Sequence, residues 1–540
     1  MTSSAQPPQT ARPAGRLSAP FGAAALLLAS APTHAATPVE ERSVAELQGD
    51  MAEGRATSEA LVRAYLDRIA RIDRRGPALH SVLAVNPQAV QDARRLDAER
   101  RAGRVRGPLH GVPLLIKDNI EDASGLPTTA GSLALKDNVT GRDAPLVARL
   151  KAAGAVILSK TNLSEWANIR SSRSISGWSA VGGLVKNPYA LNRNACGSSS
   201  GTGAAVAASL AAAGVGTETD GSITCPAAVN GLVGLKPTVG LVSRTRVVPI
   251  SHSQDTPGPM GRTVADVAAL LTALAGSDPA EADARRTDYT AALRGASLRG
   301  RRLGVLRFAD PGRPELKAAY EAALAALRAA GAELVEVRDW RPPSVGAQEQ
   351  LVLVTELKAD LNAYLADTDP ARVKSRTLAD LIAFNAATPR ELGLFGQDTF
   401  EAAQKTGGLN DPAYLKARAE SRKAAADAID GRLAADRLDA LIWPSSGPAW
   451  PSDAAGGDHF SGAGATGLAA VAGYPHLTVP MGLVRELPVG LSFIGPRWSE
   501  ARLLALGAAF EAAARARRPP RYLPSVEAAP SVAPLLAPAP

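Results

Sequence analysis

The most restrictive feature of this sequence is a strand pattern that follows a helix pattern, and it occurs twice. In residues 143–160, DAPLVARLKAAG has helical periodicity, and AVILSK after Gly154 has the composition of a buried strand. In residues 302–337, RLGVLRF is typical of a strand, Pro314 opens a helix, Gly331 ends it, and AELVEV is typical of the next strand. Strand, helix and strand in this order predict a βαβ unit, in which helices cover a sheet.

Further segments extend this pattern over most of the chain. Additional strands are predicted at 111–117, 439–443, 476–480 and 489–494, and additional helices after Thr57 or Ser58 and from about 499 to 513. A chain of 540 residues with 46% hydrophobic residues can bury a large core. We therefore expect an α/β fold, built as a single large domain with a mixed, twisted β-sheet covered by helices on both faces.

The N-terminal residues have the pattern of an export signal. Two arginines precede the apolar run GAAALLLASA at 22–31 and the small-residue stretch THAA at 33–36. We expect residues 1–35 to be a signal peptide, cleaved after Ala35 or Ala36, and the protein to be periplasmic or secreted. The apolar run is too short for a stable membrane anchor.

The rest of the chain divides into one domain and a tail. Residues 36–525 contain all the predicted strands and helices. Residues 526–540 are rich in alanine and proline, a composition that predicts disorder.

Charge and cysteine content exclude several classes of function. The 60 basic and 52 acidic side chains are interleaved without a basic block, which argues against a nucleic-acid partner. The two cysteines, Cys196 and Cys225, fit neither a disulfide scaffold nor a zinc site. We expect no metal and no organic cofactor, and the sequence does not indicate the oligomeric state.

The glycine-serine stretch ACGSSSGTGAAVAA at 195–208 permits three interpretations. A phosphate-binding loop requires a lysine after the glycine turn, but Ala204 and Ala205 follow Gly203. A G-x-S-x-G elbow would make Ser199 the nucleophile of an α/β-hydrolase, but the polar residues 186–196 are not the buried strand that the elbow needs. The third interpretation is that the stretch belongs to a longer catalytic array.

That array includes two further residues. Ser222 follows Gly221 in GTETDGSITCPAA, 24 residues after Ser198, and Lys117 follows the apolar stretch VPLLI. Together they resemble the amidase signature family. The resemblance covers nearly all of the mature chain, through the blocks HGVPLLIKDNI, SKTNLSEWA, CGSSSGTGAAVAA, GTETDGSI, NGLVGLKPTVGLVSR, SQDTPGPMGRTVAD and LPVGLSFIGPRWSEARLLALGAAFE. Within the family, GSSSGTG, TETDGSITCPA and ELKADLNAYLAD look most like the peptide amidases, which remove the amide from peptide C-termini.

The resemblance implies a role for each matching residue. Ser222 is the expected nucleophile, Ser198 the bridging serine whose preceding peptide bond is cis, and Lys117 the base. The expected oxyanion hole consists of backbone N–H groups, those of Thr219, Asp220, Gly221 and Ser222. Ser199 is then a neighbour of the reacting groups.

A lysine can act as this base only when it is neutral. Near neutral pH this requires a pKa about 3 units below its usual value of about 10.4. Burial produces such shifts because it disfavours the ammonium form, and the apolar residues 114–116 precede Lys117. The alternative is a lysine at a strand end that extends to solvent.

The sequence departs from many family members at two positions beside the nucleophile. Asp220 stands where many have a second glycine, and Thr224 where many have an arginine. The aspartate adds a charge near the expected oxyanion, so its carboxylate must point away or be paired. The peptide-amidase-like sequences share both changes.

For several other residues, the sequence is compatible with two different roles. Asp118 and Asn119 either orient the site or cap a turn, Asp255 is expected to bond turn amides, and Trp166 and Trp178 line a groove or pack in the core. The histidines at 110, 252, 459 and 476 lack metal-binding spacing. If Ser198 and Ser222 touch, the two cysteines are close enough to pair after export, and the sequence leaves that pairing open.

The sequence therefore predicts an amidase that acts through an acyl-enzyme and releases ammonia. The expected substrate is a small-molecule or peptide amide, with the C-terminal amide of a peptide as the preferred class. The alternatives are an amidase for aryl or aliphatic amides, a subunit of a tRNA-dependent amidotransferase, and a periplasmic binding protein without catalytic activity.

Overall fold

A computed structural model describes residues 37–276, 287–307, 313–460, 464, 466–536 and 538. The predicted signal peptide, residues 1–35, lies outside the described residues. Within the described part, no helix combines the length and apolar character that crossing a membrane would require.

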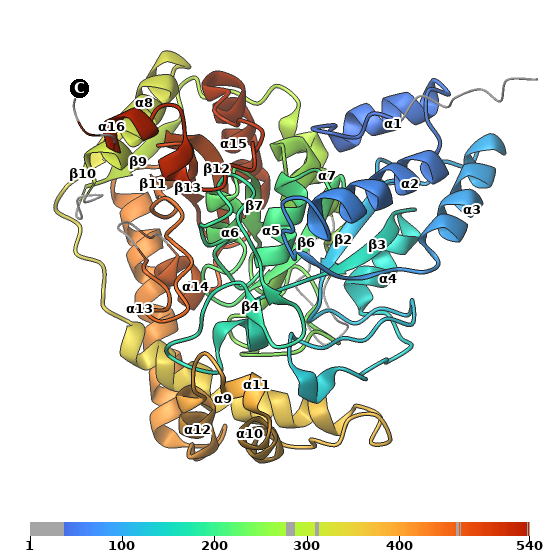
Figure 1. Cartoon of the computed structure of the whole chain (residues 1–540). Coiled ribbons are helices and arrows are strands. Elements are labelled where there is room, and N and C mark those ends of the chain that lie inside the picture. The colour runs from blue at the N-terminus through green and yellow to red at the C-terminus, as the bar shows by residue number, and fades with distance from the viewer. Residues whose placement is uncertain are drawn as a thin grey trace, which may run out of the picture. The chain divides into compact units, whose positions relative to one another are not determined.

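A large mixed sheet forms the centre of this part of the chain (Figure 1). Its strands are β1 (Val82–Val85), β2 (Pro113–Lys117), β3 (Val156–Thr161), β6 (Ala213–Glu218), β7 (Val233–Lys236), β8 (Thr256–Gly261), β9 (Arg302–Leu306), β10 (Glu333–Val337), β11 (Ala440–Pro444), β12 (His476–Val484) and β13 (Leu487–Ile494). They lie in the order β1-β3-β2-β6-β8-β7-β12-β13-β11-β9-β10. Neighbours are parallel in β3-β2-β6 and in β11-β9-β10 and antiparallel elsewhere. A separate two-stranded ribbon pairs β4 (Trp178–Ser179) with β5 (Gly183–Leu184).

Helices cover both faces of the sheet, as predicted. The helices are α1 (Val44–Ala52), α2 (Ser58–Arg68), α3 (Ala89–Arg101), α4 (Pro145–Ala152), α5 (Ser200–Ala207), α6 (Thr224–Val229), α7 (Val264–Leu274), α8 (Pro314–Ala329), α9 (Gly346–Ala366), α10 (Leu378–Ala387), α11 (Pro389–Leu392), α12 (Asp398–Gln404), α13 (Pro412–Ala435), α14 (Gly467–Ala472), α15 (Glu500–Ala514) and α16 (Ala533–Leu536). Val479 of β12 faces Gly507 of α15, whereas Gly490 of β13, paired with Pro480, faces Ala228 of α6. Because successive strand residues point to opposite faces, α15 and α6 cover opposite sides of the sheet.

The predicted strands are all present, with ends that differ by a few residues, and the α/β prediction is confirmed. Four strands of the sheet were not predicted, namely β1, β6, β7 and β8. The segments of β6 and β8, AGVGTE and TPGPMG, are rich in glycine and proline. These glycines are required by close packing. A Cβ at Gly214 would lie 2.7 Å from Thr202 Cγ2 of α5, and one at Gly216 would lie 2.7 Å from Ser199 Oγ. A prediction from strand propensity fails for β6 because its backbone lies close to α5, and this close approach requires glycine in place of residues that favour strands.

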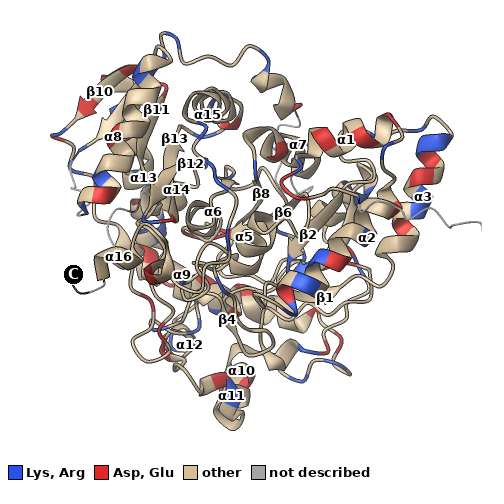
Figure 2. Ribbon diagram, turned by 45° about the horizontal axis from the view of Figure 1, so that its top comes forward, with Lys and Arg blue, Asp and Glu red and all other residues tan. Residues whose placement is uncertain are grey.

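The segment between Trp340 and Asp411, which has little sequence pattern, forms α9 to α12. In Figure 1 these helices gather below the sheet, together with the lower part of α13. They have their own apolar cluster, in which Leu357, Leu361 and Phe400 are fully or almost fully buried. In the ribbon of Figure 2, basic and acidic residues are interspersed along the helices, as the sequence pattern indicates.

The C-terminal boundary needs a correction. Residues 526–536, which composition predicted to be disordered, include a short 3-10 helix at Val526–Ala528 and the helix α16. Val526, Ala529 and Val532 are buried in the main apolar core. The prediction of disorder from composition was wrong because a few apolar side chains, spaced three residues apart, attach this alanine- and proline-rich segment to the core.

Candidate active site

Lys117, the predicted base, is the last residue of β2 and is fully buried. Its strand lies between β3 and β6, so the side chain leaves the sheet inside the protein. Nζ lies 2.7 Å from Ser198 Oγ and 2.8 Å from Thr217 Oγ1. Asn119 Nδ2 donates to the same Thr217 oxygen at 3.0 Å. Asn119 therefore helps to position the lysine through Thr217, which was one of its two expected roles.

Burial lowers the pKa of Lys117 to about 7, and the negative charges of Asp255 and Glu218 oppose this shift. Because its partners at Nζ include the hydroxyl of Ser198, a neutral amine here can accept a proton from that hydroxyl. The interpretation of Lys117 as a strand-end lysine that extends to solvent is wrong.

Ser198 lies in the loop before α5 and is also fully buried. The peptide bond between Gly197 and Ser198 is cis, as the resemblance implies. A Cβ at position 197 would collide with Ser164 Oγ, so glycine is required there. The next serine, Ser199, is engaged with β6: its Oγ donates to Thr217 O at 3.1 Å and accepts from Thr217 N at 3.2 Å.

Ser222 lines a cavity of about 400 Å³, called the serine cavity below. Its wall also contains Cys196, Gly197, Gly221, Cys225, Leu353, Trp450 and Thr466. Ser199 N donates to Ser222 O at 3.1 Å, which joins the two serine segments through their backbones. Among the described residues, no hydrogen bond joins the hydroxyls of Ser222 and Ser198. Of the two side-chain contacts that would link Lys117, Ser198 and Ser222 in a row, this structure contains the one between Lys117 and Ser198.

The backbone around Ser222 makes a tight turn. Gly221 has φ +81°, which favours glycine. Within the described part of the chain, the N–H groups of Thr219, Asp220, Gly221 and Ser222 have no hydrogen-bond acceptor, and all four residues line the serine cavity. A cluster of unpaired N–H donors facing a cavity can bind an oxyanion there.

Asp220, which the sequence required to point away or be paired, is exposed and lines the serine cavity. It forms no ion pair with a described residue, but the side chain of Thr466 is hydrogen-bonded to it. Thr224, at the position where many family members have an arginine, donates its hydroxyl to Glu218 Oε2 at 3.2 Å.

Glu218 is a site residue that the sequence reading missed. It is the last residue of β6, and its buried carboxylate accepts from Ile223 N at 2.8 Å and from Thr224 N at 2.9 Å. These bonds hold the turn that carries Ser222. An acidic residue at a strand end, just before a glycine turn, was the available signal, but TETDG contains two acidic residues and the sequence does not say which is buried.

Cys196 and Cys225 form a disulfide, which settles the pairing that the sequence left open. Cys196 lies two residues before Ser198, and Cys225 lies three residues after Ser222. The disulfide therefore joins the two serine-bearing segments covalently at the wall of the serine cavity.

The loop at 250–255 packs beside these groups. Asp255 accepts from the backbone N–H groups of Ile250 and Ser251 at 2.8 and 2.9 Å, as expected for a turn aspartate, and from Thr219 Oγ1 at 2.6 Å. Burial raises the pKa of Asp255 to about 6. The loop is thus attached directly to the turn that carries the unpaired N–H groups.

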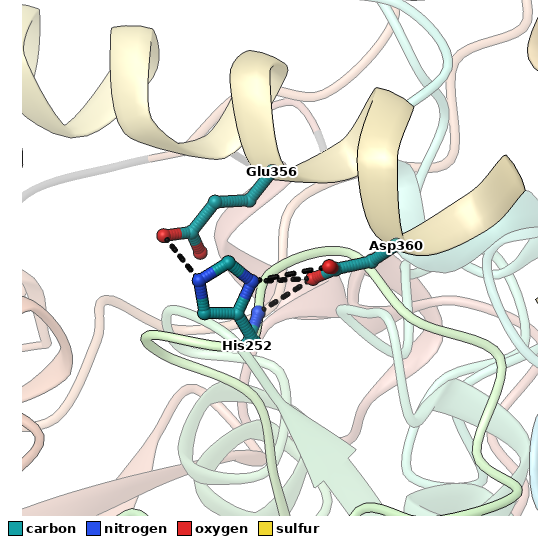
Figure 3. A group of neighbouring side chains, drawn as sticks. All are labelled: His252, Glu356 and Asp360. Atoms are coloured by element: carbon teal, nitrogen blue, oxygen red, sulfur yellow. Dashed lines mark hydrogen bonds and ion pairs between the residues drawn. The ribbon is translucent and has the colours of Figure 1, made fainter. Parts of the chain in front are cut away.

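Two carboxylates of α9 hold the same loop through His252 (Figure 3). The imidazole lies between them, with Nε2 3.2 Å from Glu356 Oε1 and Nδ1 2.9 Å from Asp360 Oδ2. Glu356 also accepts from Ser253 N at 3.0 Å and from Tyr414 Oη at 2.7 Å. In the described residues, this is the only group of three or more histidine, cysteine or carboxylate side chains close enough to hold a metal ion. Because each imidazole nitrogen faces a different carboxylate, the geometry is that of a structural clamp.

The remaining candidates have structural positions. Asp118 accepts from Thr129 N at 3.1 Å and lies 3.8 Å from Lys160 Nζ. Trp166 and Trp178 are buried and pack edge to face on Phe400 and Phe395, so core packing is the correct interpretation for both.

Comparison with known proteins gives a consistent result. The family model described as Amidase matches residues 60–504. The chain is 37% identical to a probable amidase of Arabidopsis thaliana, over 90% of this chain and 92% of that protein. It is 36% identical to a subunit of the glutamyl-tRNA(Gln) amidotransferase of Salinispora arenicola, over 90% of this chain and 99% of that protein.

Among solved structures, the native peptide amidase from Stenotrophomonas maltophilia is similar with a TM-score of 0.85. The two chains are 51% identical, and the match covers 90% of this chain and 99% of the other. The residues matched by the family model, 60–504, include every strand of the sheet and the whole described lining of the serine cavity.

Proposed function

Because this chain belongs to the amidase family and is an amide hydrolase, we propose that it hydrolyses the C-terminal amides of peptides through Ser222, Ser198 and Lys117. The observation that carries this proposal is the fully buried Lys117 Nζ, 2.7 Å from Ser198 Oγ. The 51% identity to a peptide amidase supports the choice of substrate class.

In the proposed mechanism, neutral Lys117 accepts the proton of Ser198, and Ser198 accepts the proton of Ser222 as Ser222 Oγ attacks the amide carbon. The N–H groups of the 219–222 turn bind the oxyanion of the tetrahedral intermediate. The protonated lysine then returns a proton through the same path to the leaving nitrogen, and ammonia departs. Water attacks the acyl-enzyme by the same relay, which releases the peptide acid and restores Ser222.

The relay requires the Ser222 hydroxyl to turn toward Ser198. Both side chains lie on segments that are joined by the Cys196–Cys225 disulfide and by the hydrogen bond from Ser199 N to Ser222 O. A rotation about one side-chain bond is a small change compared with a movement of either segment. We therefore assign the missing contact to the substrate-bound state.

Export is the second part of the proposal. We propose that residues 1–35 direct the protein to the periplasm or the medium and that the mature chain begins at 36 or 37. The disulfide supports this location because disulfides persist in oxidising compartments. An exported enzyme would not meet the tRNA that a tRNA-dependent amidotransferase requires.

The test of the reaction is ammonia release from a short peptide amide. We expect release by the mature protein, a loss on the order of a thousandfold or more in Ser222→Ala and in Lys117→Ala, and near wild-type release in the matched control Ser446→Ala. Ser446 lines the same cavity but has no proposed role. If Ser222→Ala remains fully active, the catalytic assignment is wrong.

The substrate class is tested separately. The same assay is run with an aryl amide and a simple aliphatic amide, which are the alternative substrates. A kcat/KM for the peptide amide that exceeds both would support the proposal. A higher kcat/KM for either alternative would replace the peptide amide while leaving the reaction unchanged.

A further inference from the structure

A second cavity, called the apolar pocket below, adjoins the serine cavity. It has a volume of about 280 Å³, and its wall is formed largely by apolar side chains that include Trp340, Val345, Trp443 and Leu468. Gly464 lines both cavities. The apolar pocket therefore shares part of its wall with the site at which the amide is proposed to be cleaved.

Each of the two cavities has a single carboxylate in its described lining. Asp220 is the only ionisable side chain described along the serine cavity, and Glu349 is the only one along the apolar pocket. The two cavities meet close to Asp220: a Cβ on Gly467, which lines the apolar pocket, would lie 3.7 Å from Asp220 Oδ2. Taken together, the described linings of the two cavities thus contain two acidic groups and no basic group.

Neutral side chains are the hydrogen-bonding partners of both carboxylates: Thr466 at Asp220 and Gln254 at Glu349. Glu349 Oε1 accepts from Gln254 Nε2 at 2.8 Å, and neither carboxylate forms an ion pair with a described residue. Lys236 interacts electrostatically with Asp220, but it is fully buried and lines neither cavity. Burial and the negative charge of Asp220 both raise the pKa of Glu349. A cation between the two groups would relieve this repulsion.

We propose that the apolar pocket binds an apolar side chain of the peptide amide, and that Asp220 and Glu349 bind its protonated amino terminus. The inference rests on the proposed function, since it assigns specificity to that same site. The pocket has the apolar lining that a hydrophobic or aromatic side chain needs, and the carboxylates supply the charge complementary to an ammonium group. The same charges disfavour the peptide acid, because its new carboxylate lies beside Asp220 after hydrolysis.

The charge preference is tested with two substrates that differ only at the amino terminus. A dipeptide amide with a phenylalanine first residue is compared with its N-acetylated form, on the wild type and on Glu349→Gln. We expect the wild type to favour the free amine in kcat/KM by about tenfold, mainly through KM. In Glu349→Gln we expect most of this preference to disappear, because one of the two carboxylates loses its charge. Glu420→Gln, an exposed glutamate of α13, is the matched control.

The apolar contact is tested by filling the pocket. Gly346 lines the pocket, and a Cβ at this position meets no atom within 4 Å, so we choose Gly346→Phe to add bulk to the lining. We expect this variant to raise KM for the substrate with a phenylalanine first residue more than for one with glycine there. Circular dichroism of both variants verifies the fold.

The outcomes separate two kinds of failure. If the wild type releases no ammonia from any peptide amide, the proposed function itself is wrong. If it does but shows no preference for the free amine, or if Glu349→Gln keeps that preference, the binding of the amino terminus is overturned. Equal effects of Gly346→Phe on both side chains would overturn the role of the apolar pocket.

Discussion

At the scale of single residues, the main feature of the site is a buried lysine and the groups that surround its amine. Lys117 is fully buried and has hydroxyl and carbonyl partners in place of a carboxylate at hydrogen-bonding distance. A direct ion pair would stabilise the ammonium form and prevent the side chain from acting as a base. Two acidic groups, Asp255 and Glu218, raise the pKa of Lys117, but both are hydrogen-bonded to backbone N–H groups. Their effect is smaller than that of burial, so the pKa of Lys117 stays below its usual value.

The first prediction concerns the pH dependence of the reaction. Because burial lowers the pKa of Lys117 to about 7 and the base must be neutral, kcat/KM should rise with pH and reach half its plateau near pH 7. The measurement is kcat/KM from about pH 5 to about pH 9, with an N-acetylated peptide amide so that the substrate does not titrate. A rate that does not change across this range would contradict Lys117 as the base.

A charge variant sharpens this experiment. Asp255→Asn removes a negative charge that raises the pKa of Lys117, so the rise in kcat/KM should move to lower pH. The control Asp288→Asn alters an exposed helix cap and should leave the profile in place. A shift to higher pH in Asp255→Asn would show that the electrostatic interpretation has the wrong sign.

The second prediction concerns Glu218, which we regard as a positioning residue. Glu218→Gln weakens the charged acceptor of the Ile223 and Thr224 N–H groups, which hold the turn beside the reacting carbonyl. We expect kcat to fall by about 10- to 100-fold with little change in KM. The rise in kcat/KM with pH should also move to lower pH, because the charge of Glu218 raises the pKa of Lys117.

The control for this variant is Glu46→Gln in α1. The Glu46 carboxylate also accepts a backbone N–H, that of Ser43, but it is exposed and belongs to a helix cap with no role in the site. This control should keep both kcat and the pH profile of the wild type. A normal kcat in Glu218→Gln would refute the positioning role.

At the scale of the elements, strands and loops from separate parts of the sequence contribute to the site, and a disulfide and hydrogen bonds join them to one another. Strands β2 and β6 are parallel neighbours, and Lys117 and Glu218 are the last residues of the two strands, so both lie at the carboxyl ends of these strands. The loop before α5 and the turn before α6 supply the two serines. The disulfide joins these last two segments, and α9 holds the 250–255 loop against the turn.

The third prediction is that the disulfide stabilises this arrangement. Cys196 and Cys225 are 29 residues apart, and closing a loop of that length contributes about 3 to 4 kcal/mol in the chain-entropy model. Cys196→Ala with Cys225→Ala should therefore lower the free energy of unfolding by about that amount and reduce kcat. Chemical denaturation with and without reductant is the measurement. Reductant should destabilise the wild type and have no effect on the double variant; equal stability of the oxidised wild type and the variant would contradict the prediction.

The fourth prediction concerns the clamp formed by His252, Glu356 and Asp360. The hydrogen bond to Asp360 raises the pKa of His252 above its usual value of about 6.5. The stabilisation is therefore fully present below about pH 6.5 and is lost as the pH rises through the higher pKa of the folded state. The loss of stability in His252→Gln should be larger near pH 6 than near pH 9. Unfolding curves at the two pH values measure it, and a destabilisation that is independent of pH would show that the imidazole is uncharged in the folded protein.

The sequence predicts the elements at the periphery of the site better than those at its centre. The strands that contain Leu114, Val305 and Leu491 have the apolar patterns of buried strands and were predicted. The strand β6 was not, because its glycines serve packing against α5 and remove the pattern. The prediction of Lys117, Ser198 and Ser222 as site residues rests on family resemblance. Glu218 is buried and accepts two backbone N–H groups, and the spacing of residues in the sequence does not predict these contacts. The clamp on His252 depends on a helix about a hundred residues further along the chain, which has little pattern of its own.

At the scale of the whole molecule, the described chain combines a large part built around the sheet with a helical region that has a separate apolar cluster. The sheet and the helices on its two faces share one large apolar core, and α9, α10 and α12 contribute to a separate one. The serine cavity lies where these parts meet: Ser222 belongs to the sheet part, and Leu353 belongs to α9. This division places Ser222 on the part that contains the sheet, whereas α9 contributes residues to the linings of the serine cavity and the apolar pocket. Glu349, on the first turn of α9, is one such residue.

The fifth prediction connects the N-terminal sequence to the chemistry of the folded enzyme. If residues 1–35 are an export signal, the full-length gene product should be recovered from the periplasm or medium with its N-terminus at 36 or 37. Protein made without residues 1–35 should stay in the cytoplasm, where Cys196 and Cys225 remain reduced. Mass spectrometry of both forms after alkylation determines the first residue and the thiols in one experiment. Exported protein should contain no reactive thiol, and cytoplasmic protein should contain both and be less stable, for the reason given for the disulfide. An intact N-terminus on active protein in the cytoplasm would overturn the export proposal, and the amidase assignment would stand without it.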